Sequence, residues 1–410
     1  MINKERLFNR LMELGEIGKL ATGGITRQVF TLEDISATTL VATYMREAGL
    51  SVRVDAVGNL IGRKEGLNTE ASVVLTGSHI DTVHEGGAFD GSLGVLGGIE
   101  ALQTMNEQGI QTEQPIEVIA YKDEEGCRFS FSMLGSRAIA GILKREDLQC
   151  LDRDGMSFAE ALKMNGFVPD HFQQAARPLG SVKAHLELHV EQGKVLESKN
   201  LSVGVVTGIN SSLWLKITLK GEAGHAGATP MGIRHDPLVA AAEIIQAVEE
   251  ETLKTGTAVG TVGRIQVQPG GINIIPGSVE FTVDLRDLNQ AVGERLEQTL
   301  LQRVAEVCQR RGIENVIEVL QRVPPVPCSE PIQEAIKQAC RKVGKEIYSL
   351  PSGAGHDSMQ IARLCPIGMI FVRSKDGISH NPAEWSSAED CADGVNVLYH
   401  SLLSLANNEK

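Results

Sequence analysis

The chain has 410 residues, a formal net charge of −13 and 42% hydrophobic residues. One hydrophobic core rarely serves more than about 300 residues, so this length predicts two domains. The acidic balance argues against nucleic acid or an anionic membrane as a partner, because both attract basic patches, whereas a small anionic ligand is not excluded. No apolar segment approaches the roughly 20 residues of a membrane span, and the seven cysteines include no C-x-x-C pair. We therefore expect a cytoplasmic protein with reduced thiols.

Helix and strand patterns alternate in the first part of the chain. Apolar residues recur at helical spacing in residues 31–49, and residues 92–107 form a second predicted helix. The short apolar runs at 73–76 and 116–121 are typical of buried strands. Strand–helix–strand order predicts an α/β core.

The pattern changes near residue 210. Apolar and polar residues alternate from Leu213 to Lys220, which predicts a half-buried strand. A helix is predicted to begin at Asp236-Pro237, since proline suits the first helical position. The elements expected after it are strands at 259–267 and 279–285, a helix at 292–310 and a strand at 316–320. This β-α-β-β-α-β order is that of the ferredoxin-like motif, so we predict that residues 210–326 form a domain inserted into one made of residues 1–209 and 327–410.

Two adjacent carboxylates follow the predicted strand at 116–121. Glu124 and Glu125 repel each other, so a fold that buries both needs a compensating positive charge. A metal ion supplies that charge, and one carboxylate can bind it while the other stays free to move a proton. Further nitrogen and oxygen ligands are available at His79, Asp81, Asp90, His189 and His380. His79 and Glu124 both follow strands, where open α/β sheets place their ligand sites.

Each of these residues also has an ordinary structural interpretation. Asp90 lies in a glycine-rich loop and suits a turn. His189 lies in an apolar stretch and suits a buried core position, and His380 suits a plain loop. No single motif decides between these interpretations and a metal site.

Seven motifs that occur in one order along the chain decide the matter. They are Gly77-Ser78-His79, Phe89-Asp90-Gly91, Asp123-Glu124-Glu125, Glu187-Leu188-His189 with Gln192, Gly224-His225-Ala226, Gly355-His356-Asp357 and Ser379-His380-Asn381 with Glu384. Together they resemble the amidase branch of the aminoacylase and carboxypeptidase superfamily. That branch holds N-carbamoyl-L-amino acid hydrolases, β-ureidopropionase and allantoate amidohydrolase, and the motifs are most similar to the first group.

The resemblance implies a di-metal, aminopeptidase-like catalytic domain at residues 1–209 and 327–410. Asp90 would bridge two divalent ions, with His79 and His189 completing one ion and Glu125 and His380 the other. Glu124 would be the general base, and Asp81 would hold the His79 ring and set its tautomer. Nitrogen and oxygen ligands without a thiolate suit Mn, Co, Ni or Zn.

The resemblance also implies a homodimer through the inserted lid domain at 210–326. In that scheme His225 reaches into the site of the partner subunit and stabilises an oxyanion. Arg286, on the polar face of the strand at 279–285, would pair with the carboxylate of a small anionic ureido (carbamoyl) substrate. The other implied substrate contacts are Asn273, Gly355 and His356, with Gln192 at the ureido group.

The implied reaction is hydrolysis of the carbamoyl C–N bond of an N-carbamoyl-L-amino acid to the amino acid, CO₂ and ammonia. A ureidopropionase or an allantoate amidohydrolase is the main alternative, followed by a dipeptidase. Residues 209–213 lack the arginine found there in allantoate amidohydrolases, which weakens the case for allantoate. A non-catalytic metal-dependent binding protein is a further alternative, although such a protein would not need Glu124.

Overall fold

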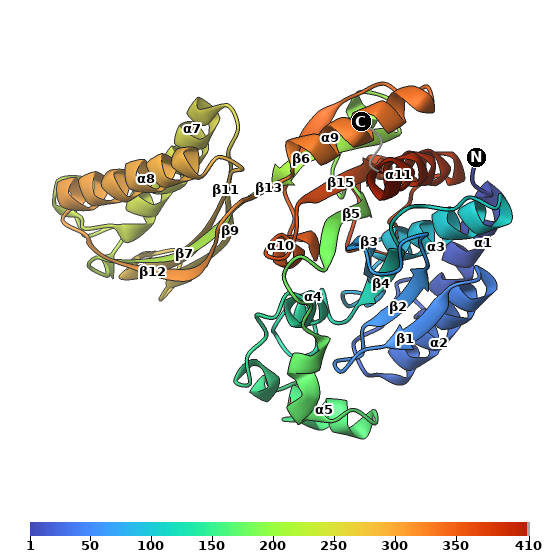
Figure 1. Ribbon diagram of the computed structural model, residues 1–410. Helices are drawn as coiled ribbons and strands as arrows, with labels where there is room; N and C mark the ends of the chain where they lie inside the picture. The colour runs from blue at the N-terminus through green and yellow to red at the C-terminus, as the bar shows by residue number, and fades with distance from the viewer. Residues whose placement is uncertain (408–410) are drawn as a thin grey trace. The chain divides into compact units, whose positions relative to one another are not determined.

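The computed structural model describes residues 1–407 and is drawn in Figure 1. The chain divides into two compact units, one made of Met1–Thr207 with Cys328–Lys410 and the other of Gly208–Pro327. The sequence predicts an inserted segment at 210–326. Each unit has its own buried apolar core, which is what lets a chain of this length fold.

The first unit is built on a nine-stranded mixed sheet. Its strands are, in spatial order, β1 (Ser51–Val54), β2 (Leu60–Lys64), β4 (Ile116–Tyr121), β3 (Val73–His79), β5 (Val182–Val190), β15 (Ile367–Val372), β6 (Val203–Ile209) and β13 (Val326–Pro327), with β14 (Ser349–Ser352) pairing with β6. The central strands β4, β3, β5 and β15 run parallel. Their carboxyl ends therefore meet at one edge of the sheet, where α/β folds place ligands.

Helices cover both faces of this sheet. One apolar core joins it to α1 (Lys4–Gly15), α2 (Leu32–Glu47), α3 (Ser92–Glu107), α9 (Glu330–Lys342) and α11 (Ala388–Asn407). The opposite face packs against α4 (Leu134–Ile139) and α10 (Ser358–Ile361). The short helix α5 (Phe158–Met164) belongs to a separate hydrophobic cluster, and α6 (Val195–Ser198) follows β5 in the chain. The α/β class predicted from the sequence is confirmed.

The second unit is a four-stranded antiparallel sheet in the order β12 (Glu314–Val323), β7 (Ser212–Lys220), β11 (Ser278–Arg286) and β9 (Val259–Gln268). Figure 1 shows α7 (Pro237–Thr255) and α8 (Gln290–Arg311) side by side on one face of it. The alternating apolar residues of β7 and β11 are buried beneath these helices, as the alternation predicts. Asp236 caps α7 by accepting from the Leu238 and Val239 amides, which explains why the helix begins at Pro237.

Two short strands in this unit have no counterpart in the predicted elements. β8 (Gly224–His225) pairs with β10 (Ile274–Ile275), and His225 lies opposite Ile274. Two residues are too few to show an alternating pattern, so this pairing has no signal in the sequence. Within residues 1–407, no helix is long and apolar enough to cross a membrane.

Candidate metal centre

The carboxyl edge of the parallel strands brings the proposed metal ligands together. His79 ends β3, Glu125 follows β4, His189 lies near the end of β5 and His380 follows β15. Asp90 directly precedes Gly91, the residue that caps α3. A Cβ atom on Gly91 would lie 2.4 Å from His79 Nε2, so the loop can pass the imidazole ring only with glycine at this position.

The buried carboxylate of Asp90 faces three imidazole rings. Its Oδ1 lies 3.1 Å from His189 Nε2 and 3.6 Å from His79 Nε2. Its Oδ2 lies 3.1 Å from His380 Nε2. Burial by itself raises the pKa of Asp90, but hydrogen bonds with the three histidines outweigh burial and hold that pKa well below its ordinary value. Asp90 is therefore a carboxylate at the centre of the cluster.

Backbone carbonyl groups orient two of the rings. His79 Nδ1 lies 3.0 Å from the Asp81 carbonyl oxygen, and His189 Nδ1 lies 2.9 Å from the Val190 carbonyl oxygen. A carbonyl oxygen only accepts, so each Nδ1 carries a proton, and Nε2, which faces Asp90, is the nitrogen that can bind a metal once its own proton is displaced. This is the tautomer that a metal-binding histidine needs.

The ligands form two overlapping groups whose donor atoms lie within 4.8 Å of one another. One group is His79, Asp90 and His189, and the other is Asp90, Glu125 and His380. Because Asp90 belongs to both, the residues fit two cations that share this carboxylate. All donors are nitrogen or oxygen, a set that suits first-row divalent metals.

The charges of the site also fit a cation. Burial raises the pKa of Glu125 to about 7, and the neighbouring Asp90 adds to the rise. Burial likewise raises the pKa of Glu124 well above its ordinary value. The hydrogen bond with Asp90 raises the pKa of His380 to about 9. These groups therefore favour added positive charge, which metal ions supply when they displace protons.

Asp81 supports this region in a way that the sequence does not predict. Its main-chain oxygen, rather than its carboxylate, makes the 3.0 Å contact with the His79 ring. Its carboxylate accepts from the Glu124 amide at 3.3 Å and from the Glu125 amide at 3.1 Å. Asp81 therefore links the loop after β3 to the loop after β4, and it holds the backbone of both glutamates.

Glu384, which ends the last motif, contacts the backbone of the loop that carries Asp90. Its Oε1 accepts from the amides of Phe89 at 2.9 Å and Asp90 at 3.0 Å, and its Oε2 lies 2.8 Å from Ser379 Oγ. A Cβ atom on Gly87 would lie within 2.4 Å of this side chain, which explains the glycine. The sequence predicts no role for Glu384 or Ser379, although both belong to the motif around His380.

Gln192 contacts the proposed metal ligands through the nitrogen of its side-chain amide. Its Nε2 donates to Asp90 Oδ2 at 2.9 Å. Its Oε1 is buried and has no hydrogen-bond partner among the residues that the structure describes. Gln192 and His380 both have a positive φ, at 58° and 53°, and such backbone strain in non-glycine residues is concentrated at functional sites.

His356 lies behind the cluster and is only 2% exposed. Its ring packs against the His189 ring at 4.5 Å between centroids, and its Nε2 lies 2.7 Å from Ser352 Oγ. Burial, together with His189, lowers the pKa of His356 to about 3. The neighbouring Gly355 is exposed, so in this structure the glycine and not the histidine is open to a ligand.

The remaining predicted substrate residues belong to the second unit. His225 and Asn273 are neighbours across the β8–β10 pair, where the Ala226 amide donates to the Asn273 carbonyl oxygen at 3.0 Å. Arg286 ends β11, and its guanidinium donates to Asp284 at 2.8 and 3.1 Å. The structure therefore brings His225 and Asn273 together and gives Arg286 a carboxylate that orients it.

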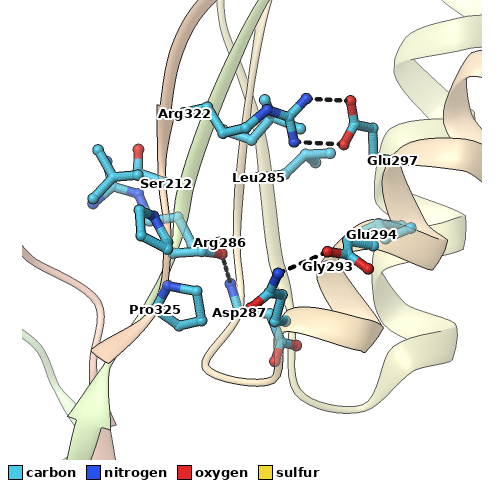
Figure 2. Close-up of a pocket in the computed structure, with 15 residues that line it drawn as sticks. Ser212, Leu285, Arg286, Asp287, Gly293, Glu294, Glu297, Arg322 and Pro325 are labelled. Atoms are coloured by element: carbon cyan, nitrogen blue, oxygen red, sulfur yellow. Dashed lines mark hydrogen bonds and ion pairs between the residues drawn. The ribbon is translucent and has the colours of Figure 1, made fainter. Parts of the chain in front are cut away.

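Arg286 also lines a cavity of about 200 Å³ within this unit. Figure 2 shows the cavity between the strand ends and the start of α8, where Arg322 makes two hydrogen bonds to Glu297. Leu213, Leu285 and Leu296 contribute much of its apolar lining.

Comparisons with known proteins identify the family of this chain. The family model described as peptidase family M20/M25/M40 matches residues 75–404. An N-carbamoyl-L-amino acid amidohydrolase of Geobacillus stearothermophilus is 56% identical over 409 residues, and the match covers 100% of both chains. An allantoate deiminase of Arabidopsis thaliana is 38% identical, and the match covers 97% of this chain and 82% of the deiminase. A solved amidase of the hydantoinase/carbamoylase family from Burkholderia multivorans has a TM-score of 0.94 at 37% identity and covers 99% of this chain and 98% of its own. The family resemblance predicted from the motifs is confirmed, and the chain belongs to the peptidase family M20/M25/M40.

Proposed function

We propose that this protein hydrolyses the carbamoyl C–N bond of N-carbamoyl-L-amino acids and releases the amino acid, CO₂ and ammonia. One observation carries the proposal: a buried glutamate, Glu124, lies beside ligands for two metals in a chain 56% identical to an N-carbamoyl-L-amino acid amidohydrolase. The paired roles of metal ligand and proton carrier are those needed to hydrolyse an unactivated C–N bond.

The candidate divalent ions are Mn, Co, Ni and Zn, and five residues would hold two of them: His79, Asp90, Glu125, His189 and His380. When bound, the ions supply Lewis acidity toward water and toward the scissile carbonyl group. Asp90 would contribute a ligand to each of the two ions, and the carbonyl oxygens of Asp81 and Val190 keep a proton on Nδ1 of two imidazole rings, which leaves Nε2 for a metal.

Glu124 is the proposed proton carrier. Its Oε2 lies 3.8 Å from His79 Nε2, so its carboxylate borders the metal ligands. Asp81 fixes its backbone through the Glu124 amide. In this scheme Glu124 accepts a proton from the attacking water and passes it to the nitrogen that leaves.

Gln192 supports a ureido substrate. Its Nε2 donates one hydrogen bond to Asp90, whereas its buried Oε1, a pure acceptor, has no partner among the described residues, and we propose that a substrate donor satisfies it. The terminal NH₂ of a carbamoyl group supplies the matching donor. A dipeptide carries no NH₂ group on its scissile carbonyl carbon, so this contact favours carbamoyl compounds.

The second unit is the proposed ferredoxin-like lid and dimerisation domain. Arg286, Asn273 and the loop at Gly355 would bind the substrate carboxylate, and Asp284 would hold the Arg286 fork in position. His225 would donate a hydrogen bond to the oxyanion in the site of the partner subunit. The antiparallel sheet has edge strands at β9 and β12, and edge strands are suited to pairing with a second copy.

Allantoate hydrolysis is the second candidate, favoured by the 38% identity to an allantoate deiminase. Turnover of N-carbamoyl-L-amino acids, their D-enantiomers, N-carbamoyl-β-alanine, allantoate and a dipeptide should be compared with metal-loaded protein. The proposal predicts the highest kcat/KM for an N-carbamoyl-L-amino acid and strong preference over its D-enantiomer. A higher kcat/KM for allantoate or the dipeptide would refute it.

A further inference from the structure

The loop that carries His225 is held by an arginine. Arg234 is half-buried, and its Nη2 donates to the Ala226 carbonyl oxygen at 2.5 Å and to the Thr229 carbonyl oxygen at 2.8 Å. Its Nε also donates to the Thr229 oxygen, at 2.9 Å. The planar guanidinium therefore brackets the turn from Ala226 to Thr229, a geometry that the single ammonium group of lysine cannot reproduce.

The peptide bond between Ala226 and Gly227 connects this arginine to the histidine. A trans peptide is planar, and its carbonyl oxygen and amide hydrogen point in opposite directions. With the Ala226 oxygen held by Arg234, the Gly227 N–H points to the other side, where it donates to His225 Nδ1 at 3.1 Å. The positive charge on the carbonyl side also polarises this peptide and strengthens its N–H as a donor.

A second amide completes the surroundings of His225 Nδ1. The Ala228 amide donates to the same nitrogen at 3.2 Å. The amides of Ala228 and Thr229 also donate to the His225 carbonyl oxygen, at 3.2 and 3.1 Å, which closes the turn. A ring nitrogen that accepts from two N–H groups carries no proton, so the proton of the neutral ring lies on Nε2.

We propose that Arg234 is a positioning residue that, through the Ala226–Gly227 peptide, fixes His225 as the Nε2–H tautomer and so makes it a hydrogen-bond donor. The inference rests on the proposed function in one respect, because the acceptor is the oxyanion that develops on the carbamoyl group. In the other tautomer Nε2 would present a lone pair and repel that oxyanion.

A double-mutant cycle tests whether Arg234 acts through His225. His225→Ala should lower kcat by about 10²–10³-fold, the usual loss for one oxyanion donor. Arg234→Ala should lower kcat by about 10-fold or more and change KM by less than about threefold. In the His225→Ala background, Arg234→Ala should change kcat by less than about twofold, because the histidine through which it acts is gone. Added guanidinium ion should restore part of kcat to Arg234→Ala and none to the double variant.

Two further variants keep this test independent of folding. Arg310→Ala removes an exposed arginine from α8 in the same unit and should keep the wild-type kcat. Arg234→Lys keeps the charge without the fork and should lose most of the activity that Arg234→Ala loses. An equal loss on Arg234→Ala in both backgrounds, or an unchanged kcat in the wild-type background, would overturn the proposal.

The tautomer can be read without any turnover. Long-range ¹H–¹⁵N NMR of protein labelled at histidine, with the His225 signals identified by their loss in His225→Ala, should show a proton on Nε2 and none on Nδ1. Arg234→Ala should show a mixture of tautomers. A proton on Nδ1 in the wild type would refute the inference about Arg234, whereas an absence of carbamoyl hydrolysis with Nε2–H intact would refute the proposed function alone.

Discussion

Glu384 accepts a hydrogen bond from the backbone N–H of Asp90 at 3.0 Å. Its second oxygen lies 2.8 Å from Ser379 Oγ, and that hydroxyl group lies 3.1 Å from Asp90 Oδ2. Ser379 is the chain neighbour of His380. One buried glutamate therefore sets the position of two segments that carry proposed metal ligands, although it is not itself a proposed ligand.

Replacing Glu384 should weaken metal binding. Glu384→Ala leaves the Phe89 and Asp90 amides without their acceptor, and loss of such outer support typically costs about 10–100-fold in metal affinity. Glu384→Gln keeps an acceptor oxygen for these amides and should lose less. Calorimetric titration of the metal-free protein with Mn²⁺ measures the affinity, and Glu389→Ala, at an exposed glutamate of α11, is the matched control. Equal affinity in wild type and Glu384→Ala would show that Asp90 needs no such support.

Replacing Glu124 should remove turnover and keep the metals. Glu124→Gln cannot carry a proton, and a general base typically contributes about 10²–10⁴-fold to the rate. Its metal content, measured by elemental analysis, should equal that of the wild type. Glu125→Gln is the contrasting variant, because it removes a proposed ligand and should lower the metal content. If Glu124→Gln loses metal instead, Glu124 is a ligand and the base lies elsewhere.

Much of the fold follows from local patterns in the sequence. Apolar residues are periodic in α2 and β11 and form a short run in β4, and the structure places these elements and α3 within about two residues of the predicted bounds. Local signals fix them because burial of their apolar side chains dominates their energetics. The β8–β10 pair lacks such a signal, since it is too short for any periodicity.

The contacts that build the site were less predictable. Gln192 and Asp90 are 102 residues apart, and Glu384 and Asp90 are 294 apart, so only the folded sheet brings them together. The motifs identify which residues matter through their resemblance to a family. They do not reveal that Asp81 contacts the His79 ring through its carbonyl oxygen, because every residue carries that group.

Arg286→Lys should impair substrate binding although the charge is retained. A forked guanidinium can hold both Asp284 and a substrate carboxylate, whereas an ammonium group cannot do so with the same geometry. KM should rise by about 10-fold or more, the scale of one charged hydrogen bond. Esterifying the substrate carboxylate should harm the wild type far more than the variant. Arg322→Lys, which disturbs a forked ion pair with Glu297, is the control for structural effects. Equal loss of activity on esterification in the wild type and in Arg286→Lys would exclude Arg286 from carboxylate recognition.

A site shared between subunits predicts complementation between two inactive variants. Glu124→Gln and His225→Ala homodimers should each be nearly inactive. If the site uses Glu124 of one subunit and His225 of the other, a mixed dimer places both changes in one site and leaves the second site intact. Random reassociation gives about half mixed dimers, so about a quarter of wild-type activity should return.

The mixing experiment requires unfolding both variants together, refolding them with metal and measuring the share of mixed dimers by mass. Each variant refolded alone is the control. Mixed dimers without recovered activity would show that His225 serves the site of its own subunit, and a monomeric wild type would exclude a shared site altogether.

The most direct test of a two-metal carbamoyl hydrolase is a metal titration followed by activity. Protein stripped with a chelator is titrated with Mn²⁺, and release of methionine from N-carbamoyl-L-methionine is measured at each step. We predict no turnover before metal is added and a plateau at about two ions per chain, because Asp90 serves two ligand groups. A plateau at one ion per chain, or hydrolysis that persists in the stripped protein, would contradict the account.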